Sequence, residues 1–196
     1  MGPYDRTTYG GKPVDWLTRA ALEDVSTELY GAPDQLTILQ GSYNAGGVAA
    51  SAGTHDGGGA VDLAPYDADR KVLVLREHGF AAWHRAELWK DGVRVWGEHI
   101  HAELIGDRMA SAGAKAQWAE YLKGENGLAN HGPDDGPRDF VNNRYHWQRG
   151  AQRITRAAAL MQRAQLLLST GIRGYAVGKS RKALRDAASQ LPKGSK

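Results

Sequence analysis

Hydrophobic residues near the start of the chain follow the three-and-four spacing of an amphipathic helix. The pattern predicts a helix over residues 15–30, with an apolar face formed by Trp16, Leu17, Ala20, Ala21, Val25 and Leu29. Gly31-Ala32-Pro33 predicts the end of this helix, because glycine and proline commonly follow helix C-termini. The apolar run of residues 36–39 then predicts a short buried strand.

Glycine dominates the next segment, residues 41–59, which has few apolar residues to anchor it. A loop of this length in a compact domain is usually functional, so we expect site residues here. An extended pattern resumes over residues 60–63, and Asp67 is predicted to cap a helix that runs through Arg76 to Gly79.

Alternating positions predict antiparallel strands in the middle of the chain. Residues 82–89 alternate along one strand, residues 90–92 supply a turn, and residues 93–96 return. Residues 99–104 form a further strand, in which one face carries Ile100, Ala102 and Leu104 and the other carries His99, His101 and Glu103. Three large aromatic residues of this region are expected in the core: Trp83, Trp89 and Trp96. The alternative is that one of them lines a substrate groove.

The last third of the chain predicts helices separated by a break. A helix is expected over residues 112–123, with these side chains available for burial: Ala116, Trp118, Ala119 and Leu122. Residues 124–143 are rich in Gly, Pro, Asn and Asp, which is typical of a linker or surface loop. We therefore expect a main domain over residues 1–143, followed by a helical hairpin over residues 144–196 that docks on the body or on a partner.

Charge is distributed unevenly along the chain. Residues 144–196 contain 8 Arg and 4 Lys against one Asp, a charge of +11, so the remaining residues carry −8 of the net +3. This division suggests an acidic body with a basic appendage that a polyanion would attract, such as nucleic acid, an anionic lipid surface or a bacterial wall polymer. The alternative is that these arginines only solvate the outer faces of terminal helices.

Two absences in the sequence limit its chemistry. The chain has no cysteine, so a metal ion would have to be held by His, Asp or Glu. The first residues lack the pattern of an export signal, and no run of about 18 apolar residues predicts a membrane span.

Ligand-type residues are concentrated in two short motifs. The first runs from His55 to Asp62 with glycines between them, and the second is Glu98-His99-Ile100-His101. Two imidazoles and a carboxylate make the three-ligand set of a catalytic zinc, which keeps one position open. We therefore predict a Zn²⁺ site formed by His55, Asp62 and His101.

The two motifs resemble a known family. His-x-x-Gly-x-Ala-x-Asp, followed by Glu-x-x-His, is the signature of zinc D-alanyl-D-alanine carboxypeptidases and of phage L-alanyl-D-glutamate endolysin peptidases. Their wider superfamily includes lysostaphin-type peptidases and the hedgehog signalling domain. The resemblance covers residues 35–104 and implies that His55, Asp62 and His101 bind zinc while Glu98 serves as the base.

The sequence departs from the family pattern at two places. Gly53 stands where the family usually has a serine, and residues 40–44 lack the arginine that helps to polarise the scissile carbonyl. Gln40 or Ser42 is expected to donate a neutral hydrogen bond to the developing oxyanion instead.

The identity of the base raises a geometric conflict. His99 would share the metal-facing side of a regular strand with His101, whereas Glu98 would point away. A strand that starts only at His99, after a bulge at Gly97, would bring Glu98 back toward the metal. We expect Glu98 to be the base and His99 a secondary group, and the opposite order would place the site closer to the lysostaphin branch.

Together these patterns predict an α+β fold, in which flanking helices pack on a small antiparallel sheet with a zinc groove and the basic hairpin is appended. The expected function is a zinc metallopeptidase that hydrolyses peptidoglycan stem peptides of the bacterial cell wall, as a bacteriophage endolysin. Such an enzyme would be made in the host cytoplasm and act later on the wall. Its basic helices would bind anionic wall polymers, with nucleic acid the less favoured partner.

Two alternatives remain open from the sequence. One is a non-catalytic zinc protein that binds a virion component or nucleic acid, although such a site would need no base. The other is a cellular wall-remodelling D-Ala-D-Ala carboxypeptidase, which would ordinarily carry an export signal.

Overall fold

A computed structural model describes residues 2–145 of the chain, and these residues form one compact unit that ends at Tyr145. The unit has an α+β fold, as the sequence predicted. Only the first two residues of the predicted basic hairpin, residues 144–196, are among the described residues. Within residues 2–145, no helix combines the length and the apolar character that crossing a membrane requires.

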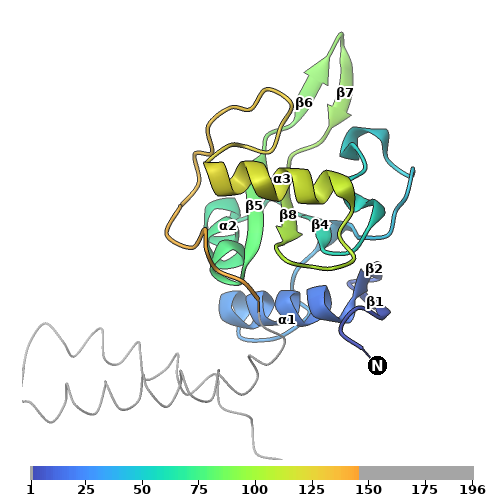
Figure 1. Cartoon of the computed structure of the whole chain (residues 1–196), viewed down its shortest axis with the longest axis vertical. Helices are drawn as coiled ribbons and strands as arrows, with labels where there is room; N and C mark the ends of the chain where they lie inside the picture. The colour runs from blue at the N-terminus through green and yellow to red at the C-terminus, as the bar shows by residue number, and fades with distance from the viewer. Residues whose placement is uncertain (1, 146–196) are drawn as a thin grey trace, which may run out of the picture. The chain divides into compact units, whose positions relative to one another are not determined.

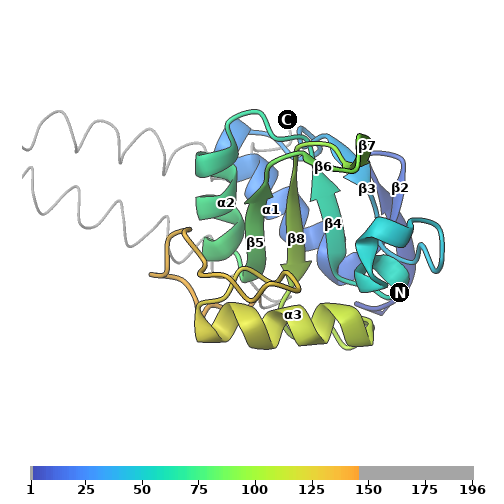
Figure 2. The same cartoon turned by 90° about the horizontal axis from the view of Figure 1, so that it is seen from above.

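A four-stranded antiparallel sheet lies at the centre of the unit (Figure 1). In spatial order its strands are β3 (Ile38–Gln40), β4 (Ala60–Leu63), β8 (His99–Leu104) and β5 (Phe80–Arg85). Helices α1 (Trp16–Tyr30) and α2 (Ala68–Glu77) pack on one face. Helix α3 (Ala112–Lys123) lies on the opposite side of the sheet from α1 (Figure 2).

The two faces of the sheet have different chemistry. One face carries Ile100, Ala102 and Leu104 of β8 into the main hydrophobic core, which α1 and α2 complete. The other face carries His99, His101 and Glu103, beside a smaller apolar cluster formed by Ala81, Trp83, Ile105 and Tyr121. The alternation predicted for residues 99–104 is confirmed, and it separates the core from the polar side chains.

Helix α1 begins and ends as the sequence predicted. The carboxylate of Asp15 accepts a hydrogen bond from the Thr18 backbone N–H at 2.8 Å, which caps the first turn. Gly31 closes the helix in the left-handed region, at φ 78°, and its N–H donates to the Thr27 carbonyl. The buried face includes Leu17, Ala21, Leu22, Val25 and Leu29.

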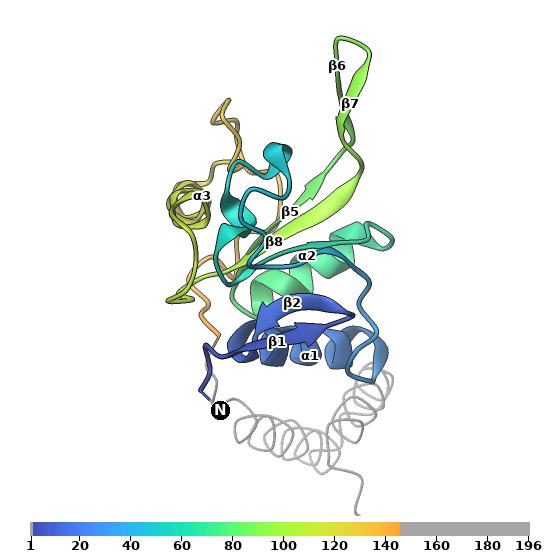
Figure 3. The same cartoon turned by 90° about the vertical axis from the view of Figure 1, so that its right-hand side faces the viewer.

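Two hairpins lie outside the central sheet. Strands β1 (Arg6–Tyr9) and β2 (Lys12–Asp15) form the first, and β6 (Leu88–Lys90) and β7 (Val93–Trp96) form the second, which projects from the body (Figure 3). The prediction of one continuous strand over residues 82–89 is wrong, because Ala86 and Glu87 separate β5 from β6.

This break changes the environment of the tryptophans that were expected in the core. Trp83, on β5, is 3% exposed and lies in the core, whereas Trp89, on the projecting hairpin, is 56% exposed. Within residues 2–145 no second layer covers β6 and β7, so their apolar side chains are exposed there. Trp96, at the end of β7, lines the pocket described below.

The ends of α3 match the prediction, but its buried face does not. Ala114 and Tyr121 are the buried side chains, seven residues apart on one stripe, whereas three residues expected to be buried are exposed: Ala116, Ala119 and Leu122. The aromatic ring of Tyr121 packs edge-on against Trp83, and this contact sets which side of α3 faces the sheet. At α2, Asp67 occupies the cap position as predicted, but its side chain makes no capping hydrogen bond.

The segment that the sequence predicted as a linker or surface loop, residues 124–143, is packed onto the body. The buried guanidinium of Arg76 donates to the carbonyls of Ala82 and Pro137 and to the carboxylate of Asp134, at 2.6 to 2.9 Å. The amide of Asn143 donates to the carbonyl of Glu77 at the end of α2. The segment is therefore a surface loop held in place by hydrogen bonds to α2 and β5.

Two carboxylates are buried together near the start of α1. Asp15 and Asp107 are 0% and 1% exposed, and the hydroxyl of Thr18 donates to Asp107 Oδ2 at 3.3 Å. Burial, followed by the charge and hydrogen bonding of Asp15, raises the pKa of Asp107 to about 7. The folded protein therefore holds a proton on this pair that the unfolded chain releases near pH 4.

Because the pKa of Asp107 is raised in the folded state, its contribution to stability is complete below about pH 4 and is lost as the pH rises to about 7. We expect a decline of up to about 1.4 kcal/mol per pH unit in that window. Asp107→Asn replaces the protonated carboxyl with a neutral amide and should flatten the dependence of unfolding temperature on pH. Asp69→Asn, at an exposed position, is the control; equal slopes in both variants would contradict the assignment.

Candidate functional site

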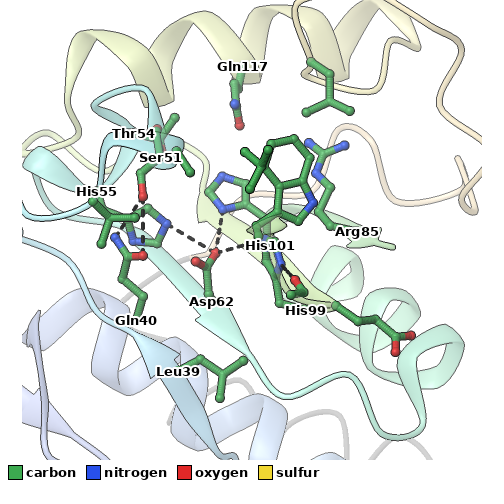
Figure 4. Close-up of a pocket in the computed structure, with 17 residues that line it drawn as sticks. Leu39, Gln40, Ser51, Thr54, His55, Asp62, Arg85, His99, His101 and Gln117 are labelled. Carbon is green, nitrogen blue, oxygen red and sulfur yellow. Dashed lines mark hydrogen bonds and ion pairs between the residues drawn. The ribbon is translucent and has the colours of Figure 1, made fainter. Parts of the chain in front are cut away.

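A pocket of about 310 Å³ opens on the polar face of the sheet (Figure 4). Its walls come from strands β4, β8 and β5, from the glycine-rich loop, and from Gln117 of α3 and Leu128 of the following loop. The end of the projecting hairpin, residues 95–98, adds to its rim.

The three predicted ligands meet in this pocket. His55 lies on a short 3-10 helix (Thr54–Asp56), Asp62 on β4 and His101 on β8, and one ligand atom from each lies within 4.8 Å of the others. Asp62 Oδ1 is 2.8 Å from His101 Nδ1 and 3.3 Å from His55 Nε2. We call these three residues the His-Asp-His group; it could bind a metal ion.

Hydrogen bonds to residues outside the His-Asp-His group set the orientation of both imidazoles. His55 Nδ1 lies 2.9 Å from the carbonyl oxygen of Gly41, which can only accept, so Nδ1 carries the proton and Nε2 is free. His101 Nε2 lies 3.1 Å from Glu103 Oε1, so its Nδ1 faces Asp62 as the ligand atom. Metal-binding histidines commonly use a carbonyl or carboxylate in this way, and the donor set therefore fits a metal ion.

The pKa shifts in the group reflect this arrangement. Burial alone would lower the pKa of His101, but its hydrogen bonds to Asp62 and Glu103 raise it to about 9. Burial likewise opposes ionisation of Asp62, yet the neighbouring imidazoles of His101 and His55 hold the pKa of this carboxyl below its usual range. Asp62 is therefore an anion shared by two imidazoles, and a cation placed between them would replace the imidazole proton.

Close backbone contacts place His55 opposite Asp62. A Cβ on Gly57 would lie 2.3 Å from the carbonyl oxygen of Met109, and one on Gly58 would lie 2.5 Å from the carboxylate of Asp15. The backbone N–H of Asn44 donates to the carbonyl of His55 and anchors the other side of the loop. Only glycine permits this approach, which explains the glycine-rich motif between two of the ligands.

His99 and Glu98 take different places in the structure. His99 Nδ1 donates to the Gly97 carbonyl at 2.7 Å, which leaves Nε2 free at 3.9 Å from Asp62 Oδ1. Burial lowers the pKa of His99, which keeps the ring neutral near pH 7. Strand β8 begins at His99, as the bulge hypothesis required, but the carboxylate of Glu98 lies 2.7 Å from His84 Nε2.

The two residues predicted to stabilise the oxyanion lie in different environments. Gln40 lines the pocket, and its amide donates to the hydroxyl of Ser51 at 3.0 Å. Ser42 is fully buried, and its hydroxyl donates to the carbonyl of Ala60 at 2.8 Å. The structure therefore brings Gln40 to the pocket and leaves Ser42 outside its lining.

Sequence reasoning did not assign a role to three side chains that shape this site. Glu103 orients His101. Its position on the same strand face as His99 and His101 could have indicated this role from the sequence. Arg85 enters the pocket from β5, where alternation with Trp83 was the only clue. Gln117 reaches the pocket from α3, and no local pattern marks it.

A second group of ligand-type residues, Glu120, Glu125 and His131, lies between α3 and the loop that follows it. The side chain of His131 is 61% exposed, and its Nδ1 lies 3.1 Å from Glu120 Oε1. Exposed acidic groups of this kind are common without a metal ion, and we assign no function to this one.

Comparisons of the chain with protein-family models, with curated proteins and with solved structures find no match. Function is therefore inferred from the residues and their geometry.

The role of Glu103 can be tested through metal affinity. Glu103→Gln keeps the shape of the side chain and removes the charge that orients His101, so we expect metal affinity to fall about ten- to a hundredfold. Competition with a chromophoric chelator measures this loss, and circular dichroism verifies the fold. Glu87→Gln, at an exposed position, is the matched control; unchanged affinity in Glu103→Gln would show that the carboxylate does not act on the metal group.

Proposed function

We propose that this chain is a zinc-dependent peptidase that hydrolyses a peptide bond in the stem peptides of bacterial peptidoglycan. The observation that carries the proposal is the His-Asp-His group itself: two imidazoles held in place by hydrogen bonds and one carboxylate converge in a pocket large enough for a small peptide. A site of three protein ligands beside an open pocket is typical of catalytic rather than structural zinc.

The donor set supports zinc among the metals available to such a site. Two imidazole nitrogens and one carboxylate oxygen suit zinc, whereas magnesium and calcium prefer oxygen ligands. When bound, zinc would polarise the scissile carbonyl and acidify a water molecule. Asp62, anionic in the folded protein, offsets part of the charge of the cation.

The residues around the group supply the proton transfer. His99 Nε2 is unprotonated and free of a hydrogen bond in the pocket, so it is placed to take a proton from the attacking water and return it to the leaving amine. Glu98 can take this role only if its carboxylate leaves His84. The geometry therefore favours His99 as the base over the residue that the family pattern implies.

The substrate class rests on the resemblance of the two motifs to wall peptidases. His55 and Asp62 stand at the spacing of the first family motif, and Glu98 and His101 at that of the second. An endolysin that reaches the wall from the host cytoplasm accords with this substrate. The basic residues 144–196 would then draw the enzyme to anionic wall polymers.

Digestion of purified peptidoglycan fragments tests the proposal directly. Mass spectrometry of the products should show one stem-peptide bond cut by the full chain, which identifies the bond. Exhaustive chelation should abolish cleavage, and added zinc should restore it. Persistent cleavage without metal, or no cleavage of any stem peptide by the zinc-loaded chain, would refute the proposed function.

Two substitutions decide the identity of the base. We expect His99→Ala to lose at least about a hundredfold in turnover and Glu98→Gln to lose less, because general bases usually contribute on that scale. Bound zinc, measured by elemental analysis, should be retained in both variants. The reverse order of losses, with zinc retained, would assign the base to Glu98 and require its carboxylate to turn into the pocket.

A further inference from the structure

Arg85 is a buried cation with no direct ionic partner among the described residues, although the carboxylates of Glu103, Asp134 and Asp62 act on its charge from a greater distance. Its side chain comes from β5 and is 7% exposed, yet it makes no hydrogen bond or ion pair within residues 2–145. The Nη2 atom is fully buried and unpartnered. The face of the Trp83 ring lies 4.8 Å from the guanidinium carbon, which supports the charge without satisfying its N–H groups.

Arg76 provides a direct comparison within the same fold. It is buried to a similar extent, at 1% exposed, but its guanidinium donates to two carbonyls and to the carboxylate of Asp134. Buried charges in proteins are normally paired in this way, because an unpaired one is costly. Arg85 has only more distant carboxylates in place of such a partner, so its Nη2 remains without an acceptor in the folded chain.

The position of Arg85 relates it to the metal group. Arg85 pairs with His99 in the sheet and lines the same pocket as Asp62 and His101. In Figure 4 it lies on the side of Asp62 and His101 away from His55. The Trp83 ring stacks on His101, with 6.2 Å between the ring centroids, and it also contacts the guanidinium of Arg85. One aromatic ring therefore contacts both Arg85 and one of the three predicted metal ligands.

A second unsatisfied group lies in the same pocket. Gln117 Oε1, on α3, is buried and makes no hydrogen bond. An amide oxygen accepts from N–H groups, and a guanidinium donates in a planar fork that matches a carboxylate. The two residues together complement the end of a peptide, which carries an anionic carboxylate and an adjacent amide N–H.

We propose that Arg85 binds a carboxylate of the substrate, and that Gln117 accepts from the neighbouring amide, so that the pocket selects peptides with a free carboxylate beside the scissile bond. This inference rests on the proposed function for the identity of the substrate as a peptide. The carboxylate can be the C-terminus or an acidic side chain. It would supply the ionic partner that Arg85 lacks.

Binding, measured without hydrolysis, tests this proposal. Isothermal titration of the full chain uses three probes: N-acetyl-D-alanine, its carboxamide, and N-acetyl-D-glutamic acid α-amide, whose carboxylate is on the side chain. We expect at least one acid to bind about tenfold more tightly than the carboxamide. Arg85→Met should abolish this preference and Arg85→Lys should retain part of it. The acid that is preferred identifies the source of the carboxylate.

The metal could also attract a carboxylate, so each titration is repeated after chelation. A preference that survives chelation and disappears in Arg85→Met supports the proposal. A preference that disappears on chelation and persists in zinc-loaded Arg85→Met would assign the carboxylate to the metal and overturn it. Equal binding of acids and carboxamide by the wild-type chain would also overturn it.

Thermal unfolding separates a binding role from a structural one. Arg85→Met should lower the unfolding temperature little, because Arg85 makes no direct hydrogen bond or ion pair, whereas Arg76→Met should lower it more by removing the donor to the carbonyls of Ala82 and Pro137 and to Asp134. Equal losses in the two variants would show that Arg85 is structural. If stem peptides are not cleaved yet the carboxylate preference depends on Arg85, the peptidase proposal fails and the binding site stands.

Discussion

The site depends on one contact, between the carboxylate of Asp62 and the imidazole of His101 across neighbouring strands. The antiparallel pairing of β4 with β8 places these residues directly opposite each other. A slip of one residue would turn His101 toward the apolar core and bring Ile100 to the pocket, so the hydrophobic face of β8 enforces the register that aligns the ligands. Packing of the core and assembly of the metal group are thus consequences of the same alternation.

Unsatisfied buried polar atoms in the described part of the chain belong mostly to β5, β8 and α3. Seven of the eight such atoms belong to these elements, and two of the seven, on Arg85 and Gln117, belong to residues that line the pocket. On the opposite face of the sheet, the core contains closely packed apolar side chains. One face of the sheet therefore stabilises the fold, while the other keeps polar groups available for a ligand.

Local signals in the sequence predicted the elements whose ends and faces depend on nearby residues. Asp15 and Gly31 set the ends of α1, and alternation along β8 separated its two faces. The spacing from His55 to Asp62 predicted that those ligands meet, because glycines between them allow the loop to fold back.

Features that depend on contacts distant in sequence could not be predicted in this way. The break between β5 and β6 has no local marker, because the alternation continues through Ala86 and Glu87. The entry of Gln117 into the pocket depends on how α3 packs, which the contact between Trp83 and Tyr121 determines. The contact of Glu98 with His84 likewise joins residues on either side of the projecting hairpin, which no local pattern predicts.

The projecting hairpin has a consequence for how the protein could diversify. Arg85 and His99 are directly paired in the sheet, so everything between them is an insertion whose length the pairing does not constrain. This insertion supplies Val95, Trp96, Gly97 and Glu98 to the rim of the pocket but none of the three ligands. The three ligands and Arg85 lie outside the hairpin, so a change in its length or sequence would alter the rim of the pocket while the His-Asp-His group stays in place.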